Sequence, residues 1–333
     1  MNAEVGPGLT TLLVEDLQLL ARALPVGSRY PALERVLARG KQRQVLSPSP
    51  NHLRYQLFSA NSSRQLSVAA LTRADDCGVL PEAGSYWLRA DPVTMRADRT
   101  QVFTTSCGFA DLDQAERDEI NRIVVAAMQH EGISTPDCQN GHWCFALDAP
   151  LDFEFMPLHQ ALGLDVAEAL PSSREAIPWK RLLTEIQVDL HQSEVNVRRR
   201  AGGLQEINSV WFWGGGTLPA IEEIVFDSVF SNDPVSRGLA MASGSHLARQ
   251  HQFTRQRGTV LVDWVMASAD AVREAGALER FVQSLLSAPM GPGEGLTLLD
   301  GSGNAWALER SSRWRFWKGN RPLATALRGE PRS

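Results

Sequence analysis

The chain has 333 residues, of which 43% are hydrophobic and 21% charged, and its formal net charge at pH 7 is -5. This length accommodates one large domain or two with apolar cores, and the acidic balance excludes a global basic field that would recruit nucleic acid. No apolar stretch approaches the roughly 20 residues of a membrane span or carries the basic flank of a signal peptide, so we expect a cytoplasmic protein without membrane contact.

The first 84 residues are predicted to form a helical N-terminal region. Leucines recur at helical spacing from Leu9 to Ala23, and residues 30–39 repeat this pattern before Gly40, a residue typical of a helix C-terminus. The Ser-Pro-Ser-Pro run at 47–50 cannot continue a helix. We therefore expect small helices here, packed on a larger domain.

From Tyr86 onward the pattern changes to alternating strands and helices, which is typical of an α/β domain, expected over residues 85–322 with a tail at 323–333. Asp113 and Glu116 fit a capping box at the start of a helix. The strands at 208–213 and 258–266 are expected in a mostly parallel sheet. The other expected elements are two extended pieces around Pro92 within 86–98, a strand at 142–147, helices at 113–130, 179–192, 234–242 and 269–286, and a hairpin of 296–299 with 305–309.

Two glycine- and arginine-rich segments are candidates for anion binding. Gly214-Gly215-Gly216 follows an apolar strand, and backbone amides in such a loop can approach a phosphate, although the Gly-Lys-Ser/Thr of a P-loop is missing and a tight turn is favoured. Arg198-Arg199-Arg200 precedes a glycine pair. Both a solvated charge run and a phosphate site remain open for these arginines.

Cysteine, histidine and aromatic residues give weaker signals. Cys138 and Cys144 flank His142 without a second pair at zinc-ligand spacing, which favours structural cysteines. The scattered thiols agree with a reducing compartment. Residues 313–318 interleave basic and aromatic side chains, but the acidic total favours a terminal strand that buries its rings over a nucleic-acid contact.

Several tryptophan-rich motifs carry a family resemblance. They are Trp87-Leu-Arg-Ala-Asp-Pro-Val-Thr-Met-Arg-Ala-Asp98, Val195-Asn196-Val-Arg198, Asn208-Ser-Val-Trp-Phe-Trp-Gly214-Gly-Gly216, Leu298-Leu-Asp-Gly301 and Trp314-Arg-Phe-Trp317. With these motifs, most of the chain from 85 to 320 resembles a bacterial family of regulatory proteins of the RpfE type. That family is similar to the archaeal-type cofactor-independent phosphoglycerate mutases.

The resemblance implies an alkaline-phosphatase-like fold, a mostly parallel sheet flanked by helices. Enzymes of this kind hold two divalent metals with Asp and His ligands and transfer the phosphoryl group through a Ser near an N-terminal Asp-Gly motif. That motif is absent from the first 60 residues, and no histidine follows Val262-Asp263-Trp264 where the family keeps Asp-x-x-Gly-His. We therefore predict a degenerate scaffold with no catalytic residue, no metal and no cofactor.

The resemblance implies that substrate-holding positions are retained. The predicted ligand-binding residues are Arg89, Arg96, Asn196, Arg198, Asn208, Gly214, Gly215 and Gly216. Arginine at such positions binds a phosphorylated or carboxylated metabolite through paired hydrogen bonds. For Arg89 and Arg96, salt bridges with Asp91 and Asp98 are an equally favoured interpretation.

Three functions follow from this pattern. The first hypothesis is a non-catalytic regulatory or binding protein, with an anionic small molecule or a protein as its partner. The alternatives are an active metal-dependent phosphomutase or phosphohydrolase with a rearranged site around His246, Asp263 and Asp270, and a structural adaptor that binds another protein through Trp314 and Trp317.

Overall fold

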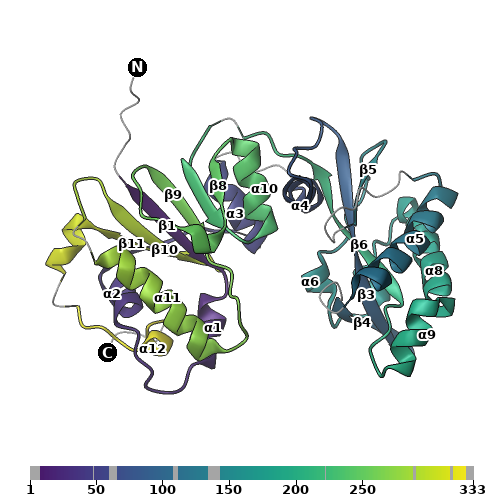
Figure 1. Ribbon diagram of the computed structural model, residues 1–333, viewed down its shortest axis with the longest axis horizontal. Helices are drawn as coiled ribbons and strands as arrows, with labels where there is room; N and C mark the ends of the chain where they lie inside the picture. The colour runs from purple at the N-terminus through teal and green to yellow at the C-terminus, as the bar shows by residue number, and fades with distance from the viewer. Residues whose placement is uncertain are drawn as a thin grey trace. The chain divides into compact units, whose positions relative to one another are not determined.

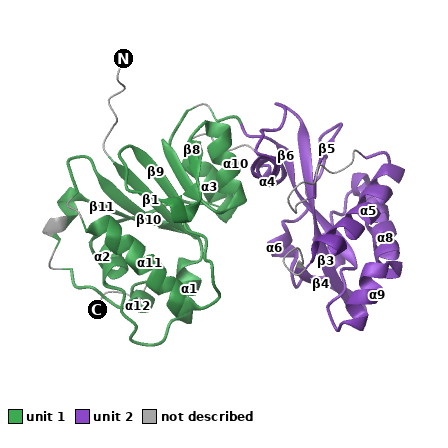
Figure 2. Cartoon of the chain, viewed as in Figure 1, with its two compact units in different colours: residues 1–63, 220–333 green, residues 64–219 purple. Residues whose placement is uncertain are grey.

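The computed structural model describes residues 8–47, 49–59, 66–107, 112–133, 143–221, 223–287, 290–315 and 318–327. The chain divides into two compact units (Figure 2). Unit 1 comprises residues 1–63 and 220–333, and unit 2 comprises residues 64–219. Unit 2 is therefore an insertion within unit 1. This division differs from the expected one, because residues 84 and 85 both lie inside unit 2.

Unit 1 contains a mostly parallel sheet (Figure 1). Within the described residues it has seven strands in the order β2-β11-β10-β1-β9-β7-β8. These are β1 (Leu9–Val14), β2 (Lys41–Gln44), β7 (Ser228–Ser231), β8 (His246–Ala248), β9 (Thr259–Asp263), β10 (Gly295–Asp300) and β11 (Asn304–Glu309). The antiparallel pair β10–β11 confirms the predicted hairpin. The arrangement confirms the expected α/β fold class.

Helices cover both faces of this sheet. The helices and short 3-10 turns of unit 1 are α1 (Leu17–Ala23), α2 (Pro31–Arg39), α3 (Pro50–Phe58), α10 (Pro234–Ser243), η2 (Gln250–Gln252), α11 (Ala271–Leu286), η3 (Arg310–Trp314) and α12 (Leu323–Leu327). α1, α2, α11 and α12 share one apolar cluster with Leu12, Val262 and Leu298. Leu13 is also buried, and since successive strand side chains alternate, it points to the opposite face. α3 and α10 contact each other beside β7.

The predicted helix from Leu9 to Ala23 is wrong in its first half. Residues Leu9–Val14 form β1, which pairs in parallel with both β9 and β10. Leu12, Leu13 and Val14 are all buried, because a strand between two parallel neighbours is covered on both faces. The resulting continuous apolar run contains leucines at helical spacing by coincidence, and the helix begins only at Leu17.

Unit 2 contains an antiparallel sheet. β3 (Tyr86–Asp98) pairs with β4 (Gln101–Cys107), β5 (Trp143–Leu147) and β6 (Ser209–Thr217), always antiparallel. The expectation that the strand at 208–213 belongs to a parallel sheet is therefore wrong, since its neighbour is β3. The expected interruption at Pro92 is also absent, because β3 continues through Pro92 opposite Val210.

The helices of unit 2 pack on this sheet. They are α4 (Val68–Cys77), α5 (Gln114–His130), α6 (Leu158–Ala161), α7 (Val166–Ala169), η1 (Arg174–Ala176), α8 (Ile177–Gln192) and α9 (Glu194–Ala201). α5 and α8 contribute Ile120, Val124 and Ile186 to a cluster with Trp143 and Phe212. The capping box of Asp113 and Glu116 is confirmed.

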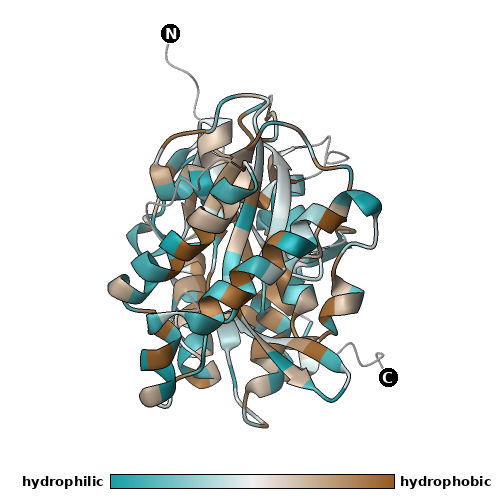
Figure 3. Ribbon diagram, turned by 90° about the vertical axis from the view of Figure 1, so that its right-hand side faces the viewer, coloured by the Kyte–Doolittle hydropathy of each residue, from teal (hydrophilic) through white to brown (hydrophobic). Residues whose placement is uncertain are grey.

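Hydrophilic and hydrophobic residues share the same helices throughout, as Figure 3 shows. This is the pattern of helices with one face on a core and one in water. Among the described residues no helix is both long and apolar enough to cross a membrane.

Candidate functional site

Carboxylates gather where three parallel strands of unit 1 end. Glu15 directly follows β1, Asp233 lies two residues after β7, and Asp263 ends β9. Asp263 is in register with both Leu13 of β1 and Ser231 of β7, so the three strands end at the same level. Open α/β sheets bind ligands at the carboxyl ends of their strands. This edge of the sheet is therefore the first candidate site.

Arg54 of α3 lies between these carboxylates. Its Nε is 2.9 Å from Asp263 Oδ2 and 3.2 Å from Asp233 Oδ1, and its Nη1 is 2.7 Å from Glu15 Oε2. The Arg54 side chain is 3% exposed and that of Asp263 is fully buried. The guanidinium thus takes the position that a cation held by the same oxygens would occupy. We call Glu15, Arg54, Asp233 and Asp263 the Arg54 cluster.

Hydroxyl and backbone donors complete this cluster. Ser236 Oγ donates to Asp263 Oδ2 at 2.6 Å, and the backbone N–H of Ser236 donates to Asp233 Oδ1 at 2.8 Å. Asp233 is in this way the N-cap of α10. Its own backbone N–H donates to Ser231 Oγ at 2.9 Å. The serine hydroxyls nearest to the carboxylates are therefore engaged in holding them in place.

The Arg54 cluster has three carboxylates and one guanidinium. Burial raises the pKa of Asp233 to about 6, because the attraction of Arg54 only partly offsets it and Asp263 adds repulsion. Burial, and then the charge of Glu15, raise the pKa of Asp16 beside it. Burial disfavours the charged form of Arg54, but Asp263, Asp233 and Glu15 outweigh this and raise its pKa. The cluster therefore keeps Arg54 charged and favours protonation of Asp233.

The two-metal site implied by the family resemblance does not fit these residues. The carboxylate oxygens that would bind metal are bonded to Arg54. Within the described part of the chain no histidine is hydrogen-bonded or ion-paired to the Arg54 cluster. The carboxylate oxygens of Glu15, Asp233 and Asp263 do not all lie within 4.8 Å of one another. A two-metal phosphoryl transfer needs those ligands free.

The rearranged site considered around His246, Asp263 and Asp270 is not assembled. His246 begins β8 opposite Ser228 of β7, and Ser228 precedes by three residues the position that pairs with Asp263. β8 is the second strand from β9 in the sheet. That places the two backbones about 10 Å apart both along and across the strands. Asp270 instead caps α11 by accepting from the backbone N–H groups of Val272 and Arg273.

Arg89, in unit 2, forms a buried ion pair with Asp91. Its Nη2 lies 2.9 Å from Asp91 Oδ1, and its guanidinium carbon lies 5.0 Å from the centre of the Trp213 ring. Trp213 Nε1 donates to Asp91 Oδ2. The salt bridge with Asp91 expected as the alternative for Arg89 is therefore present. Arg96 is exposed farther along β3.

Both predicted asparagines bond to the backbone. Asn196 is buried; its Nδ2 donates to the carbonyls of Leu190 and Ile207, and its Oδ1 accepts from the N–H of Ile207. Asn208 exchanges two hydrogen bonds with the backbone of Met95, at 2.7 and 2.8 Å. These amides connect α8, α9 and β3 to the start of β6.

The three glycines lie within β6 and pack closely. A Cβ on Gly214 would lie 3.1 Å from Val68 Cβ, one on Gly215 would lie 2.6 Å from Tyr86 Oη, and one on Gly216 would lie 3.0 Å from Ser67 Cβ. Gly214 and Gly216 also have φ of +70° and +147°. Close packing accounts for the absence of side chains at these positions.

Arg198 lies apart from the glycines. Its Nη2 is 2.7 Å from Glu119 Oε2, and it lines a cavity of about 520 Å³ together with Arg122, Arg199 and Glu116. The structure therefore places Arg89 and the glycines on neighbouring strands and Arg198 in a separate cavity. Arg96 is on the same strand as Arg89 but lies beyond the part of β3 that pairs with β6.

Cys138, His142 and Trp317 lie outside the described residues, and the side chain of Trp314 is not described either. Cys144 is buried in β5 beside Thr72. Burial raises the pKa of its thiol to about 12. A thiol of this kind is unreactive, which agrees with the structural role expected for Cys144.

Glu15, Arg54 and Asp233 are not predicted from the sequence as site residues. The available signal is polar residues directly after short apolar runs, at Glu15-Asp16 after Leu12–Val14 and at Ser231-Asn232-Asp233 after Val229-Phe230. Those runs become informative only once they are assigned to parallel strands.

No family model matches the chain. Among curated proteins it is similar to the 2,3-bisphosphoglycerate-independent phosphoglycerate mutase of Methanosarcina mazei, with 22% identity over 287 residues, covering 81% of this chain and 70% of the relative. It is also similar to the enzyme of the same name from Methanosarcina acetivorans, with 23% identity over 227 residues. That match covers 65% of this chain and 55% of the relative.

One solved structure shows a similar fold. A protein from Pyrococcus horikoshii superposes with a TM-score of 0.53 and 13% identity, over 92% of this chain and 87% of that one. The cofactor-independent phosphoglycerate mutase of Thermoplasma acidophilum has a TM-score of 0.48 and 14% identity, over 96% and 95%. The chain is a distant homologue of the cofactor-independent phosphoglycerate mutases, with their alkaline-phosphatase-like α/β fold.

Proposed function

We propose that this chain is a non-catalytic binding protein on a degenerate phosphoglycerate-mutase-like scaffold. The observation that carries the proposal is Arg54, whose guanidinium is bonded to Glu15, Asp233 and Asp263 at the carboxyl edge of the sheet. Two-metal phosphoryl transfer requires divalent cations that polarise the phosphate and activate the nucleophile. A guanidinium is a fixed single charge that neither loses a proton nor accepts an electron pair.

The charge of the Arg54 cluster also disfavours a phosphate substrate. Three carboxylates face one guanidinium, and the donors of Arg54 point at those carboxylates. A phosphorylated acid at this edge would meet excess negative charge without a cation to bridge it. Substrate binding in the manner of an active mutase is therefore not expected at the Arg54 cluster.

A regulatory role in a bacterial cytoplasm is part of this proposal, as the tryptophan-rich sequence motifs imply. In this proposal the ligand is an anionic small molecule, phosphorylated or carboxylated. A cavity of about 790 Å³ in unit 1 supports it: Gln42, Asn304, Lys318 and Arg321 are among its lining residues. Neither Lys318 nor Arg321 forms an ion pair with a carboxylate of the described residues. The positively charged and amide side chains that line this cavity can donate hydrogen bonds to a carboxylate or phosphate.

The first test is turnover. The full chain is assayed for interconversion of 2- and 3-phosphoglycerate with manganese, cobalt, magnesium or zinc, beside an active mutase as positive control. We expect no turnover above the buffer background. Metal-stimulated interconversion that survives repurification of the protein would overturn the non-catalytic assignment.

The second test is binding. Isothermal titration with 2-phosphoglycerate, 3-phosphoglycerate and phosphoenolpyruvate is expected to give saturable binding of at least one of them. The double variant K318A/R321A should lose that binding, and R198A, which alters the separate cavity of unit 2, should keep it. The metabolite-binding part of the proposal fails if none of the three binds, or if R198A loses binding and K318A/R321A does not.

A further inference from the structure

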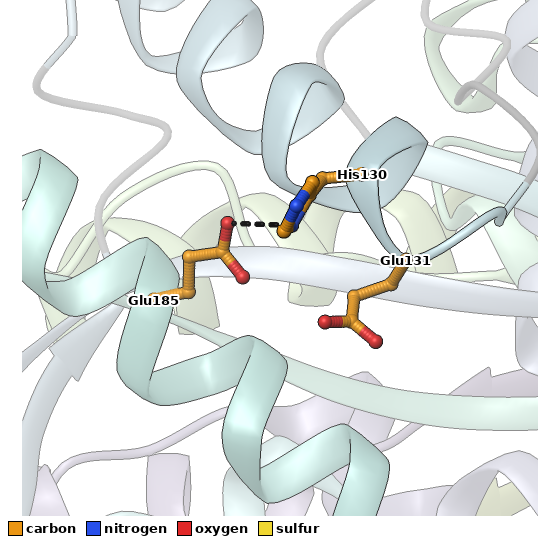
Figure 4. A group of neighbouring side chains, drawn as sticks. All are labelled: His130, Glu131 and Glu185. Atoms are coloured by element: carbon orange, nitrogen blue, oxygen red, sulfur yellow. Dashed lines mark ion pairs between the residues drawn. The ribbon is translucent and has the colours of Figure 1, made fainter.

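Three metal-ligand side chains converge on the surface of unit 2 (Figure 4). His130 is the last residue of α5, Glu131 caps that helix, and Glu185 comes from α8. One ligand atom from each lies within 4.8 Å of the other two, and no other such group occurs in the described part of the chain. The group belongs to neither the Arg54 cluster nor the cavities of the proposed function.

The distances approach those of a coordination site. His130 Nδ1 lies 3.2 Å from Glu185 Oε1. Zinc bonds to histidine nitrogen and carboxylate oxygen are about 2.0–2.2 Å, so neighbouring ligands of a tetrahedral ion lie roughly 3.3 Å apart. The carboxylate of Glu131 lies within 4.8 Å of both ligand atoms and can come closer by rotation of its side chain.

The surroundings are partly shielded on the carboxylate side and open on the imidazole side. The side chains of Glu131 and Glu185 are 15% and 32% exposed, and that of His130 is 72% exposed. The carboxyl end of the 17-residue helix α5 adds the negative end of its dipole. An entering cation would thus meet two half-buried carboxylates and a helix terminus, and water would complete its coordination.

One cation already competes for this group. Arg181, one turn before Glu185 on α8, forms an ion pair with Glu131 through its Nη2, while its own side chain is 71% exposed. An exposed ion pair of this kind is weak because water screens it. A metal ion at the group would displace Arg181 into solvent.

We propose that His130, Glu131 and Glu185 bind one divalent transition-metal ion, with zinc as the best match. An imidazole nitrogen with two carboxylate oxygens suits Zn²⁺ or Co²⁺ better than the all-oxygen coordination of Mg²⁺ or Ca²⁺. The ion would clamp the end of α5 to α8 and thereby rigidify one face of unit 2.

The test is zinc titration of the full chain after treatment with a chelator. The wild type is expected to bind zinc, and H130A and E185Q should each bind it at least tenfold more weakly. The matched control is H159A, an exposed histidine on α6 of the same unit, which should bind as the wild type does. R181Q should bind severalfold more tightly, because it removes the competing cation. His130 is exposed, so H130A is expected to fold.

Cobalt substitution identifies the ligand atoms. The expected absorption is that of a site with nitrogen and oxygen ligands, lost in H130A. A thiolate-to-cobalt charge-transfer band would place the metal on cysteine and overturn the proposal. So would wild-type zinc affinity in H130A, or the absence of zinc binding by the wild type.

Discussion

Arg54 Nε lies 2.9 Å from Asp263 Oδ2 at the carboxyl end of β9, and both side chains are almost completely removed from water. The pair joins α3, before the inserted unit 2, to a strand that follows it. A buried carboxylate needs a compensating charge. Here a side chain supplies the charge that a divalent metal supplies in a two-metal enzyme, so the Arg54 cluster is complete without an ion.

Replacing Arg54 with alanine is therefore expected to convert this cluster into a metal site. Removing one partner of a buried ion pair costs about 3–5 kcal/mol of unfolding free energy, because the remaining charge is left unpaired. In R54A the three carboxylates lose their shared partner, and their side chains can rotate toward one another to bind Mn²⁺. Thermal unfolding with and without MnCl₂ should show a lower Tm for R54A in chelator and a partial recovery in manganese.

The matched control is R54K, which keeps a positive charge beside the carboxylates. It should be less destabilised than R54A and show no recovery of Tm with manganese. Equal manganese responses of R54A and the wild type would contradict the role of Arg54 as the internal cation, and D263N combined with R54A should abolish the recovery.

The second prediction concerns pH. The folded-state pKa of Asp233 is about 6, above its ordinary value of 3.8, so between these values the folded chain binds the proton more tightly than the unfolded chain. Stability decreases with pH wherever the folded state holds more protons. The contribution of Asp233 is therefore most favourable near pH 4 and is lost as the pH rises through about 6.

The measurement compares the wild type with D233N, which removes this titration and keeps a side-chain oxygen to cap α10. Other groups titrate in both proteins, so only the difference in unfolding free energy is informative. The wild type should lose stability relative to D233N between pH 4 and pH 6.5 in urea titrations. A difference that is constant over this range, or that grows in favour of the wild type, contradicts the assignment.

Local sequence signals predicted much of the fold. The capping box of Asp113 and Glu116, the helix at 179–192 and the hairpin at 296–309 depend on residues close in the chain, and all are present. The candidate site at the sheet edge depends on Arg54 and Asp263, which are 209 positions apart and are separated by a whole inserted unit. The hydrophobic periodicity of a sequence does not indicate pairings between residues so far apart in the chain.

The helix predicted at Leu9–Val14 replaces the central strand of the sheet. Without that strand, nothing in the sequence places Glu15 at the carboxyl end of a parallel strand. A run buried on both faces has no alternation, and its spacing fits a helix equally well. The carboxyl ends of β1, β7 and β9 are therefore recognised as one edge of the sheet only from the strand order.

The third prediction separates two arginines that the sequence groups together. Arg89 is buried against Asp91 and Trp213, whereas the side chain of Arg198 is 53% exposed beside Glu119. R89A leaves Asp91 buried without its partner and is expected to cost about 3–5 kcal/mol. R198A breaks an exposed pair that water screens and is expected to leave the free energy of unfolding nearly unchanged. Urea unfolding of both variants measures the difference, and similar costs for the two would contradict it.

The fourth prediction concerns the glycines of β6. A Cβ on Gly215 would lie 2.6 Å from Tyr86 Oη and 3.2 Å from Leu88 Cδ1, and both of these side chains are buried. G215A is therefore expected to destabilise the chain by about 1–3 kcal/mol through overpacking. G202A is the control, because Gly202 has a φ of -83° and its nearest neighbour would lie 3.5 Å from the new Cβ.

A double-mutant cycle identifies the cause. Y86F removes the hydroxyl that the new methyl group would meet, so G215A should cost less in the Y86F background than in the wild type. If the glycine were kept for phosphate approach and not for packing, the cost would be independent of residue 86. If the loss of unfolding free energy in G215A/Y86F equals the sum of the losses in the two single variants, the packing role is contradicted. A loss in the double variant that is smaller than this sum establishes that Tyr86 excludes a side chain at position 215.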